Sequence, residues 1–375
     1  MHVPQTGFAT VEGTLRYRDR GVKKGMEPRH FRSFLSLFIS SLGAGTYLGE
    51  ADSLTDRLVE EAVYESVVSG GVNVIDTAIN YRMQKAERAI GRTLERLTNE
   101  GSVKREELFI STKNGYLTSD GDLQKDFWSY VQEEYIRPGK LKVDEIAGEV
   151  HSMAPRFLLD QLGRSLENLG VECIDLVYLH NAAESWIPEI GYRRFLERVA
   201  DVFSLYEKKR SEGKLRYYGF ASWNCFRVSR GEQGYTNLDD LVEVANNVGG
   251  AEHGFRFIQL PFNPAMNEAL SARNQRIADE PLTTFEAAQK LGLGVFTSAP
   301  FAEGRLLNHT RVPELEGSRA LSLLQFARSA HSAVIAPLVG QKDPVHVREN
   351  IRIGTIPPLT GEEFAERYGM LLGKR

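Results

Sequence analysis

The chain has 375 residues, of which 42% are hydrophobic and 26% charged, and its formal net charge is −4. This length suits two average domains or one large α/β barrel. The small net charge gives no reason to expect nucleic acid or an anionic membrane as a partner. The two cysteines, Cys173 and Cys225, are too few for a disulfide framework and too isolated for a metal site.

The N-terminal segment and the most apolar stretch bear on where the protein works. Residues 1–5 lack the charged start and apolar block of a signal peptide. Residues 34–49 are the most apolar run, but serines and glycines interrupt it and make it unsuitable for crossing a bilayer. The sequence therefore predicts a cytoplasmic protein.

Apolar runs typical of strands alternate with helical patterns along the chain. The predicted strands are residues 37–44, 72–76, 107–112, 174–179, 216–221, 256–260, 294–298 and 333–337. The predicted helices are residues 54–69, 85–98, 154–169, 192–213, 237–248, 283–292 and 317–330. Eight strands, seven intervening helices and no low-complexity linker predict one α/β domain, residues 1–375, built as a single (β/α)₈ barrel with its core at about 37–340.

Three segments fall outside this alternation. Within residues 1–33, residues 10–17 alternate in a way that predicts an N-terminal hairpin closing the bottom of the barrel. Residues 114–152 form a long insertion after the third strand, expected to overhang the active face either as a lid or as packing on the rim. Residues 340–375 add two short C-terminal helices.

Four polar side chains stand at or just after the ends of predicted strands. Asp76 ends the second strand and Tyr81 follows five residues later. Lys113 follows the third strand and His180 the fourth. Because the carboxyl ends of parallel barrel strands meet at one face, we expect these four side chains to lie together.

This combination of residue types suits proton transfer to a carbonyl oxygen. A tyrosine has an unperturbed pKa of about 10, and a neighbouring lysine ammonium is expected to lower that pKa toward the operating pH. An aspartate would keep the lysine in place and charged, and a histidine would donate a hydrogen bond to the substrate oxygen or share the proton. No side chain supplies hydride, so the chemistry implies a nicotinamide cofactor.

The same motifs resemble those of the aldo-keto reductases, which are (β/α)₈-barrel NAD(P)H-dependent oxidoreductases. The resemblance is carried by Asp76-Thr77-Ala78 with Tyr81, by Ser111-Thr112-Lys113, and by Ile174-Asp175-Leu176-Val177-Tyr178-Leu179-His180. It continues in order from about residue 37 to 352, through residues 165–171, residues 213–219, Gln259 and residues 339–350. The resemblance implies reduction of an aldehyde or ketone, a small-molecule carbonyl substrate, to an alcohol.

The resemblance also implies a role for each site residue. Tyr81 would be the general acid, Lys113 would lower its pKa, and Asp76 would pair with Lys113. His180 would orient the carbonyl group. The implied cofactor-binding residues are Gly45, Thr46, Tyr47, Ser222, Gln259, Ser298, Pro300, Gly340, Gln341, Lys342, His346, Glu349 and Asn350.

Within that set, Ser222 and Gln259 would hold the nicotinamide carboxamide, and residues 298–301 would pass near the pyrophosphate. The C-terminal segment 339–352 would hold the adenosine end, where a helix beginning near Pro344 offers its N–H groups to phosphate. Lys342 can replace the arginine that usually meets the 2′-phosphate, a position that His346 occupies here. NADP(H) is therefore favoured over NAD(H).

The sequence departs from the common family pattern at three further places. Ala221-Ser222 stands where many members have Ser-Asn. Ser298 stands where many have a tyrosine that stacks on the nicotinamide. The spacing from Tyr81 to Glu87 exceeds that of the common Tyr-Gly-x-x-Glu pattern.

Two other functions remain open at this stage. A lysine ending a barrel strand also serves Schiff-base aldolases, so Lys113 is a candidate for that chemistry. The protein is alternatively a redox-sensing subunit that holds the dinucleotide with little turnover. No cluster of His, Cys, Asp or Glu has the spacing of metal ligands, so no metal is expected.

Overall fold

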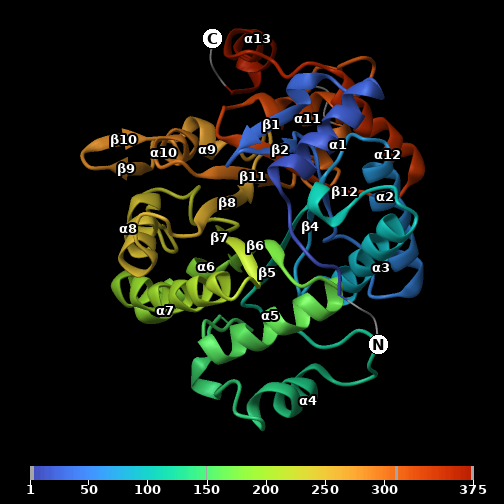
Figure 1. The fold of residues 1–375 in the computed structure, drawn as a ribbon. Coiled ribbons are helices and arrows are strands. Elements are labelled where there is room, and N and C mark those ends of the chain that lie inside the picture. The colour runs from blue at the N-terminus through green and yellow to red at the C-terminus, as the bar shows by residue number, and fades with distance from the viewer. Residues whose placement is uncertain (1–3, 149, 309–310, 373–375) are drawn as a thin grey trace.

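The computed structural model describes residues 4–148, 150–308 and 311–372. At its centre is a closed barrel of eight parallel strands, as the sequence predicts (Figure 1). In barrel order these strands are β3 (Gly43–Gly45), β4 (Val74–Asp76), β5 (Phe109–Asn114), β6 (Ile174–His180), β7 (Leu215–Ala221), β8 (Phe255–Pro261), β11 (Gly294–Ser298) and β12 (Val334–Gly340).

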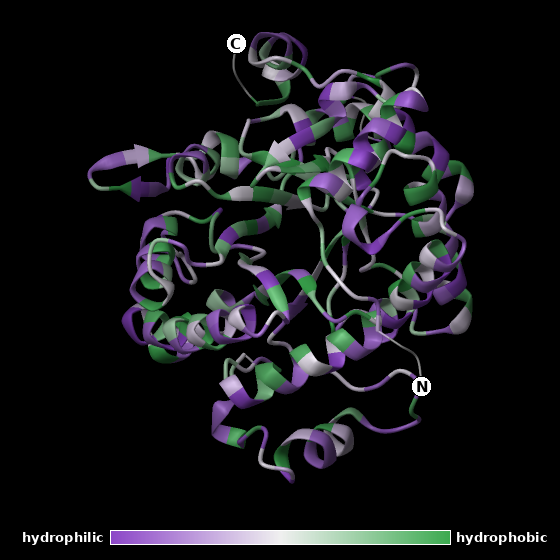
Figure 2. Cartoon of the chain, viewed as in Figure 1, coloured by the Kyte–Doolittle hydropathy of each residue, from purple (hydrophilic) through white to green (hydrophobic). Residues whose placement is uncertain are grey.

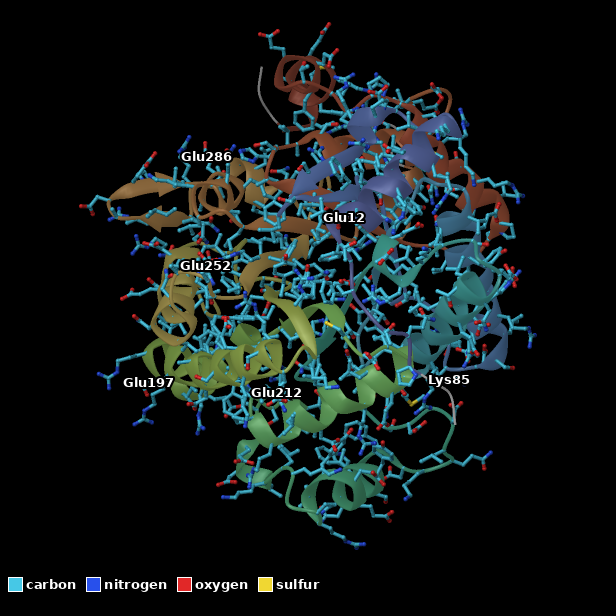
Figure 3. All side chains as sticks on the ribbon, viewed as in Figure 1. Glu12, Lys85, Glu197, Glu212, Glu252 and Glu286 are labelled. Atoms are coloured by element: carbon cyan, nitrogen blue, oxygen red, sulfur yellow. The ribbon has the colours of Figure 1, made fainter. Side chains whose placement is uncertain are left out.

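Helices between the strands cover the outside of the barrel. They are α2 (Ser53–Val68), α3 (Lys85–Asn99), α5 (Pro155–Leu169), α6 (Ala182–Ile190), α7 (Tyr192–Ser211), α8 (Leu238–Gly249), α10 (Thr284–Lys290) and α11 (Arg319–Ser329). On α7, Phe195, Val199 and Phe203 are buried against the strands at helical spacing, whereas Glu197 points outward (Figure 3). Hydrophobic and hydrophilic residues accordingly alternate along the same helix (Figure 2).

A hairpin closes the amino-terminal end of the barrel, but it is not made of residues 10–17. It pairs β1 (Phe31–Phe34) with β2 (Leu37–Ser40) through a two-residue turn, in which Leu35 and Ser36 both adopt left-handed backbone conformations. The ring of Phe34 contacts Phe257 inside the barrel at a centroid distance of 5.2 Å. The predicted strand 37–44 is therefore two strands, β2 in the hairpin and β3 in the barrel.

The predicted hairpin over residues 10–17 is wrong, because these residues begin a helix, α1 (Val11–Lys23). The side chain of Thr10 accepts a hydrogen bond from the Gly13 N–H and caps the helix. Gly13, Tyr17 and Gly21, four residues apart, form the buried face. A Cβ on Gly13 would lie 2.1 Å from a backbone oxygen, so glycine lets the helix approach closely. The helical spacing of the buried residues, one every four positions, therefore determined the structure, and the alternation within residues 10–17 did not produce strands.

The insertion after β5 contains α4 (Phe127–Val131), a π-helical turn (Gln132–Ile136) and a 3₁₀ turn (Val143–Glu145). Tyr130 and Tyr135 are buried, and the Tyr135 ring packs edge-on against Phe157 of α5 at 5.0 Å. Figure 1 shows α4 on the outer side of α5, away from the strands. The central part of the insertion is thus packed on the outside of the barrel.

The remaining elements lie late in the chain. A ribbon of β9 (Gln275–Ile277) and β10 (Glu280–Leu282), which the sequence did not predict, projects from one side (Figure 1). It follows the short helix α9 (Glu268–Ser271). The two C-terminal helices are α12 (Pro344–Ile351) and α13 (Gly361–Tyr368). Further 3₁₀ turns are Pro28–His30, Arg105–Glu107, Arg305–Asn308, Arg352–Thr355 and Gly369–Leu372.

Both cysteines, Cys173 and Cys225, are buried and unpaired. Within residues 4–148, 150–308 and 311–372, no helix combines the length and the apolar character that a membrane span requires. The same residues contain no group of three or more His, Cys, Asp or Glu side chains arranged to hold a metal ion.

Candidate active site

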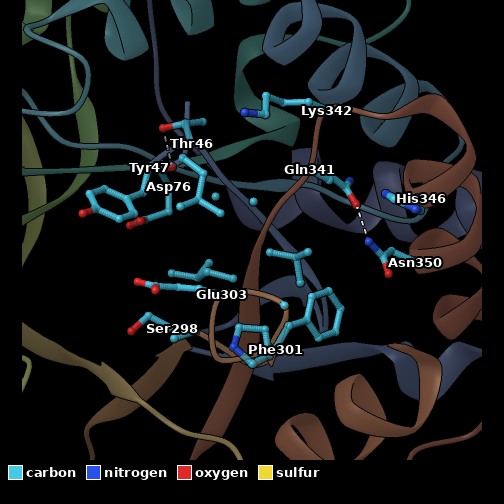
Figure 4. A pocket seen from close by; sticks show the side chains of 18 of the residues that line it. Thr46, Tyr47, Asp76, Ser298, Phe301, Glu303, Gln341, Lys342, His346 and Asn350 are labelled. Atoms are coloured by element: carbon cyan, nitrogen blue, oxygen red, sulfur yellow. Dashed lines mark hydrogen bonds between the residues drawn. The ribbon is translucent and has the colours of Figure 1, made fainter. Parts of the chain in front are cut away.

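The carboxyl ends of the barrel strands open into a cleft of about 1190 Å³. Every predicted site residue except Lys113 lines this cleft. Asp76 and Tyr81 stand at one end together with His180, while His346 and Asn350 of α12 line the other end (Figure 4). The structure therefore brings the side chains that the strand-end argument singled out to one cleft.

Asp76 and Lys113 form a buried ion pair directly below the cleft. The Lys113 ammonium is 0% exposed and lies 2.5 Å from Oδ2 of Asp76. It also donates to the Thr77 carbonyl at 2.9 Å. The other carboxylate oxygen, Oδ1, accepts from Ser111 Oγ at 2.7 Å and from Gln259 Nε2 at 3.0 Å. With both oxygens bonded, the carboxylate holds Lys113 in one position.

Tyr81 stands between that ammonium and two aromatic side chains. Lys113 Nζ lies 4.7 Å from the centroid of the Tyr81 ring. The ring contacts His180 at 5.9 Å and Tyr47 at 5.0 Å, edge-on in both cases. The phenol, the imidazole and the ammonium are therefore neighbours at this end of the cleft.

The pKa values at this end differ from the sequence-based expectation in one respect. Burial raises the pKa of the Tyr81 phenol, and the opposing effect of Lys113 is smaller. The expected net lowering is therefore wrong. Burial lowers the pKa of Lys113, but Asp76 and Tyr81 outweigh it and leave that pKa raised. At neutral pH the site holds a protonated phenol beside a charged lysine.

His180 is held from behind by a second buried histidine, His151. Nε2 of His151 donates to the backbone carbonyl of His180 at 2.8 Å, and Trp186 Nε1 donates to His151 Nδ1 at 3.0 Å. Burial lowers the pKa of His151 to about 4, so this imidazole is neutral and keeps one tautomer at working pH. Burial, assisted by Lys113 and His151, lowers the pKa of His180 well below its usual range.

The loop after Tyr81 explains the long spacing to Glu87. Arg82, Met83 and Gln84 adopt left-handed backbone conformations, with φ of 49°, 53° and 71°. Gln84 Nε2 donates to the Ser119 carbonyl at 3.1 Å and to the Tyr130 hydroxyl at 3.2 Å. Both partners belong to the insertion, which thus holds the loop that carries Tyr81.

The end of the cleft next to α12 carries a fixed amide pair (Figure 4). Asn350 Nδ2 donates to Gln341 Oε1 at 2.8 Å, and Gln341 Nε2 donates to Ser66 Oγ at 2.9 Å. Asn350 Oδ1 is buried and has no partner among the described residues. Lys342 and His346 line the same end of the cleft.

Ser222, predicted to hold a carboxamide, already has two hydrogen-bond partners. Its hydroxyl donates to Glu184 Oε1 at 2.5 Å and accepts from the Cys225 N–H at 2.7 Å. Gln259 donates its amide to Asp76, and its Oε1 accepts no hydrogen bond from the described residues.

Residues 41–320 match the family model described as the aldo/keto reductase family. The chain belongs to this family. Its members are NAD(P)H-dependent oxidoreductases that act on carbonyl compounds, and the closed eight-stranded barrel is their fold.

Aldo-keto reductase str7 from Strobilurus tenacellus is 24% identical over 281 residues, covering 75% of this chain and 61% of the relative. The NADH-specific methylglyoxal reductase of Escherichia coli (strain K12) is 22% identical over 205 residues, covering 54% and 53%. This chain thus spans about half to three-fifths of the length of these relatives. An aldo/keto reductase from Klebsiella pneumoniae in complex with NADP and acetate superimposes with a TM-score of 0.59 at 19% identity, covering 92% of this chain and 95% of that one.

Several cleft residues of this aldo-keto reductase escaped the sequence analysis. They are Asn80, Tyr116, Asn181, Trp223, Glu303 and Arg319. Asn181 and Trp223 directly follow His180 and Ser222, so both could have been predicted as cleft residues from their position next to a motif residue. Tyr116 and Arg319 carried no signal, because neither lies in a motif that matches the family.

The buried histidines of this aldo-keto reductase predict acid sensitivity. Burial lowers the pKa of His30 to about 3 and that of His151 to about 4. Between these values and the unfolded pKa of about 6.5, only the unfolded chain binds the protons. Each histidine's contribution to the free energy of unfolding is therefore complete above about pH 6.5. As the pH is lowered below about 6.5, the free energy of unfolding decreases by about 1.4 kcal/mol per pH unit for each histidine. Urea unfolding at pH 7 and pH 5.5, at constant ionic strength, measures this slope.

His30→Gln is the matched variant for that measurement. Gln retains a donor for the Gly71 carbonyl, which His30 Nε2 contacts at 2.7 Å, but it does not titrate. We expect the free energy of unfolding of the variant to depend less steeply on pH, by the contribution of one histidine. An unchanged pH dependence would contradict the low pKa assigned to His30.

Proposed function

We propose that this chain reduces an aldehyde or ketone to an alcohol, with Tyr81 as the general acid. The observation that carries the proposal is the buried Lys113 ammonium, bonded to Asp76 and 4.7 Å from the Tyr81 ring at the wall of the cleft. A buried ammonium next to a phenol stabilises the phenolate that forms when the phenol gives up its proton, so this pair suits a general acid.

Each residue then has one task in the proton transfer. Tyr81 keeps its proton at neutral pH and donates it to the carbonyl oxygen as negative charge develops there. Lys113 stabilises the resulting phenolate, and Asp76 keeps Lys113 charged and in place. The neutral His180 orients the carbonyl oxygen with its ring N–H.

The cleft fits a nicotinamide dinucleotide, which when bound supplies hydride to the carbonyl carbon. Gln259 Oε1 would accept from the carboxamide, and Gly45, Thr46, Tyr47 and Ser298 with Pro300 would line the path toward the pyrophosphate. Gly340, Gln341, Glu349 and Asn350 would hold the adenosine end, where the unpartnered Asn350 Oδ1 suits an amino group. Ser222 is less suited to the carboxamide than the sequence suggested, because its hydroxyl is engaged.

We further propose NADP(H) as the preferred cofactor, because Lys342 and His346 line the adenosine end. The Klebsiella pneumoniae structure contains NADP and the Escherichia coli relative is NADH-specific, so the relatives support either choice. Lys342→Met is expected to weaken NADPH binding about 10- to 100-fold, the value of a charged hydrogen bond, and to leave NADH binding unchanged. Titration of both cofactors measures this, and an equal loss for both would refute a contact with the 2′-phosphate.

The surroundings of Lys113 argue against a Schiff-base aldolase. That chemistry needs an accessible amine with a depressed pKa, whereas Lys113 is 0% exposed, bonded to Asp76 and has a raised pKa. A redox-sensing subunit would have the same cleft, so the rate at which the protein turns over carbonyl compounds distinguishes it from a reductase.

The test is oxidation of NADPH and NADH, in parallel, over a panel of aldehydes and ketones. Turnover with at least one carbonyl compound supports a reductase. Tight binding of cofactor with negligible turnover of the whole panel would favour the redox-sensing function.

A further inference from the structure

Two tyrosines contact the His180 ring, and only one of them has a task in the proposed reaction. Tyr81 lies 5.9 Å from the His180 ring, and Tyr116 lies closer, at 5.1 Å with an interplanar angle of 88°. Tyr116 follows β5 at the start of the insertion and lines the cleft. It is therefore a second phenol at the catalytic end.

The Tyr116 ring is fixed in position. It stands edge-on to both His180 and His151, the latter at 5.2 Å. The Tyr116 carbonyl accepts from Gln161 Nε2 at 2.7 Å. Gly115 makes this arrangement possible, because its φ is 124° and a Cβ there would lie 2.5 Å from His151 Nε2. A ring held on two sides presents its hydroxyl group at a defined place.

The phenol oxygen of Tyr116 already accepts one hydrogen bond. Asn181 Nδ2 donates to it at 3.2 Å. Burial raises the pKa of the phenol, the hydrogen bond from Asn181 lowers it by less, and the net shift is upward. Tyr116 thus keeps its proton, and its hydroxyl donates no hydrogen bond to the described residues. An unused donor on a cleft wall is available to a ligand.

Two other aromatic side chains at this end of the cleft also have a hydrogen-bond donor that is not used by any described residue. Tyr47 and Trp223 line the cleft and are 60% and 43% exposed. Each presents an aromatic face and a polar edge, an O–H or an N–H, that makes no hydrogen bond within the described part of the chain. Aromatic walls with convergent donors suit a small molecule that bears oxygen atoms beyond the reacting one.

We propose that Tyr116 is a specificity-determining residue that donates a hydrogen bond to a second oxygen of the substrate. The chain accordingly prefers aldehydes and ketones that carry a hydroxyl group over analogues that carry a methyl group in its place. This inference rests on the carbonyl reduction proposed above. Tyr116 breaks no bond in the reaction, and the reduced carbonyl still takes its proton from Tyr81.

Two pairs of ketones test the preference. Hydroxyacetone and 2-butanone differ by a hydroxyl in place of a methyl group, and 4-hydroxy-2-butanone and 2-pentanone differ in the same way one carbon farther away. We expect the protein to favour the hydroxylated ketone of at least one pair by about tenfold in kcat/KM, the value of one hydrogen bond. Tyr116→Phe is expected to abolish that ratio by slowing the hydroxylated ketone alone.

Tyr64→Phe is the control, since Tyr64 lies on α2 and its hydroxyl bonds Glu100 at 2.6 Å, away from the cleft. It should retain the parental ratio. A parental ratio near one in both pairs overturns the inference whether or not the Tyr116 variant folds. Equal slowing of both members of a pair by Tyr116→Phe also overturns it, because a structural role would do that. Turnover of the ketones without discrimination leaves the reductase standing, whereas no turnover of any carbonyl compound removes both proposals.

Discussion

Tyr81→Phe is expected to lower kcat for carbonyl reduction by about 10²- to 10⁴-fold, the usual contribution of a positioned general acid. The variant loses the only group that we assign to protonate the carbonyl oxygen. The phenylalanine ring preserves the edge-on contacts with Tyr47 and His180 and stays beside Lys113. The measurement is single-turnover oxidation of bound NADPH, which separates the chemical step from product release.

Cofactor affinity is the control for this variant. The hydroxyl of Tyr81 is at the catalytic end, so NADPH binding, followed by protein fluorescence, should stay within about twofold. A variant that loses NADPH binding would contradict the assigned role. So would a variant that keeps its parental rate, because another group would then supply the proton.

The clustering of the strand-end side chains could be predicted from the sequence because they stand at fixed places in a regular fold. Asp76 ends β4, Lys113 lies in β5 and His180 ends β6. In a parallel barrel these ends share one face, so knowing that the strands exist places the side chains together. The sign of the pKa shift at Tyr81 escaped prediction, because it depends on how much water the fold removes from the phenol.

The N-terminal helix and the insertion were harder to predict, for a different reason. Two periods are present in residues 10–17, and the Thr10 cap together with contact with the barrel favours the helical one. The insertion carries aromatic residues that suit either a lid or a packed surface. Tyr130 and Tyr135 pack on α5, but Ser119 and Tyr130 hold the loop after Tyr81.

The insertion therefore contacts the active site at both of its ends. Near its start, Tyr116 lines the cleft, and near its end, His151 holds the His180 carbonyl. Its described middle part lies outside the barrel on α5, where it anchors these two ends. This arrangement favours a positioning role for residues 114–152 over that of a lid.

Lys113→Met is expected to lower the free energy of unfolding by about 3–5 kcal/mol, the cost of leaving a buried charge without its partner. Asp76 is the group left behind, and its hydrogen bonds from Ser111 and Gln259 do not neutralise it. The same variant should lose about 10²- to 10³-fold in kcat, because the phenolate forming at Tyr81 loses its neighbouring cation. Urea unfolding and single-turnover kinetics measure the two losses separately.

Adding Asp76→Asn to Lys113→Met separates structure from catalysis. An uncharged amide at position 76 has no need of a counter-charge and can still accept the hydrogen bond from Ser111, so most of the lost stability should return. Activity should not return, because the double variant still lacks the ammonium beside Tyr81. A single variant as stable as the parent would mean that Asp76 is solvated. A double variant with parental kcat would mean that the ion pair serves the fold alone, and the role proposed for Lys113 would be abandoned.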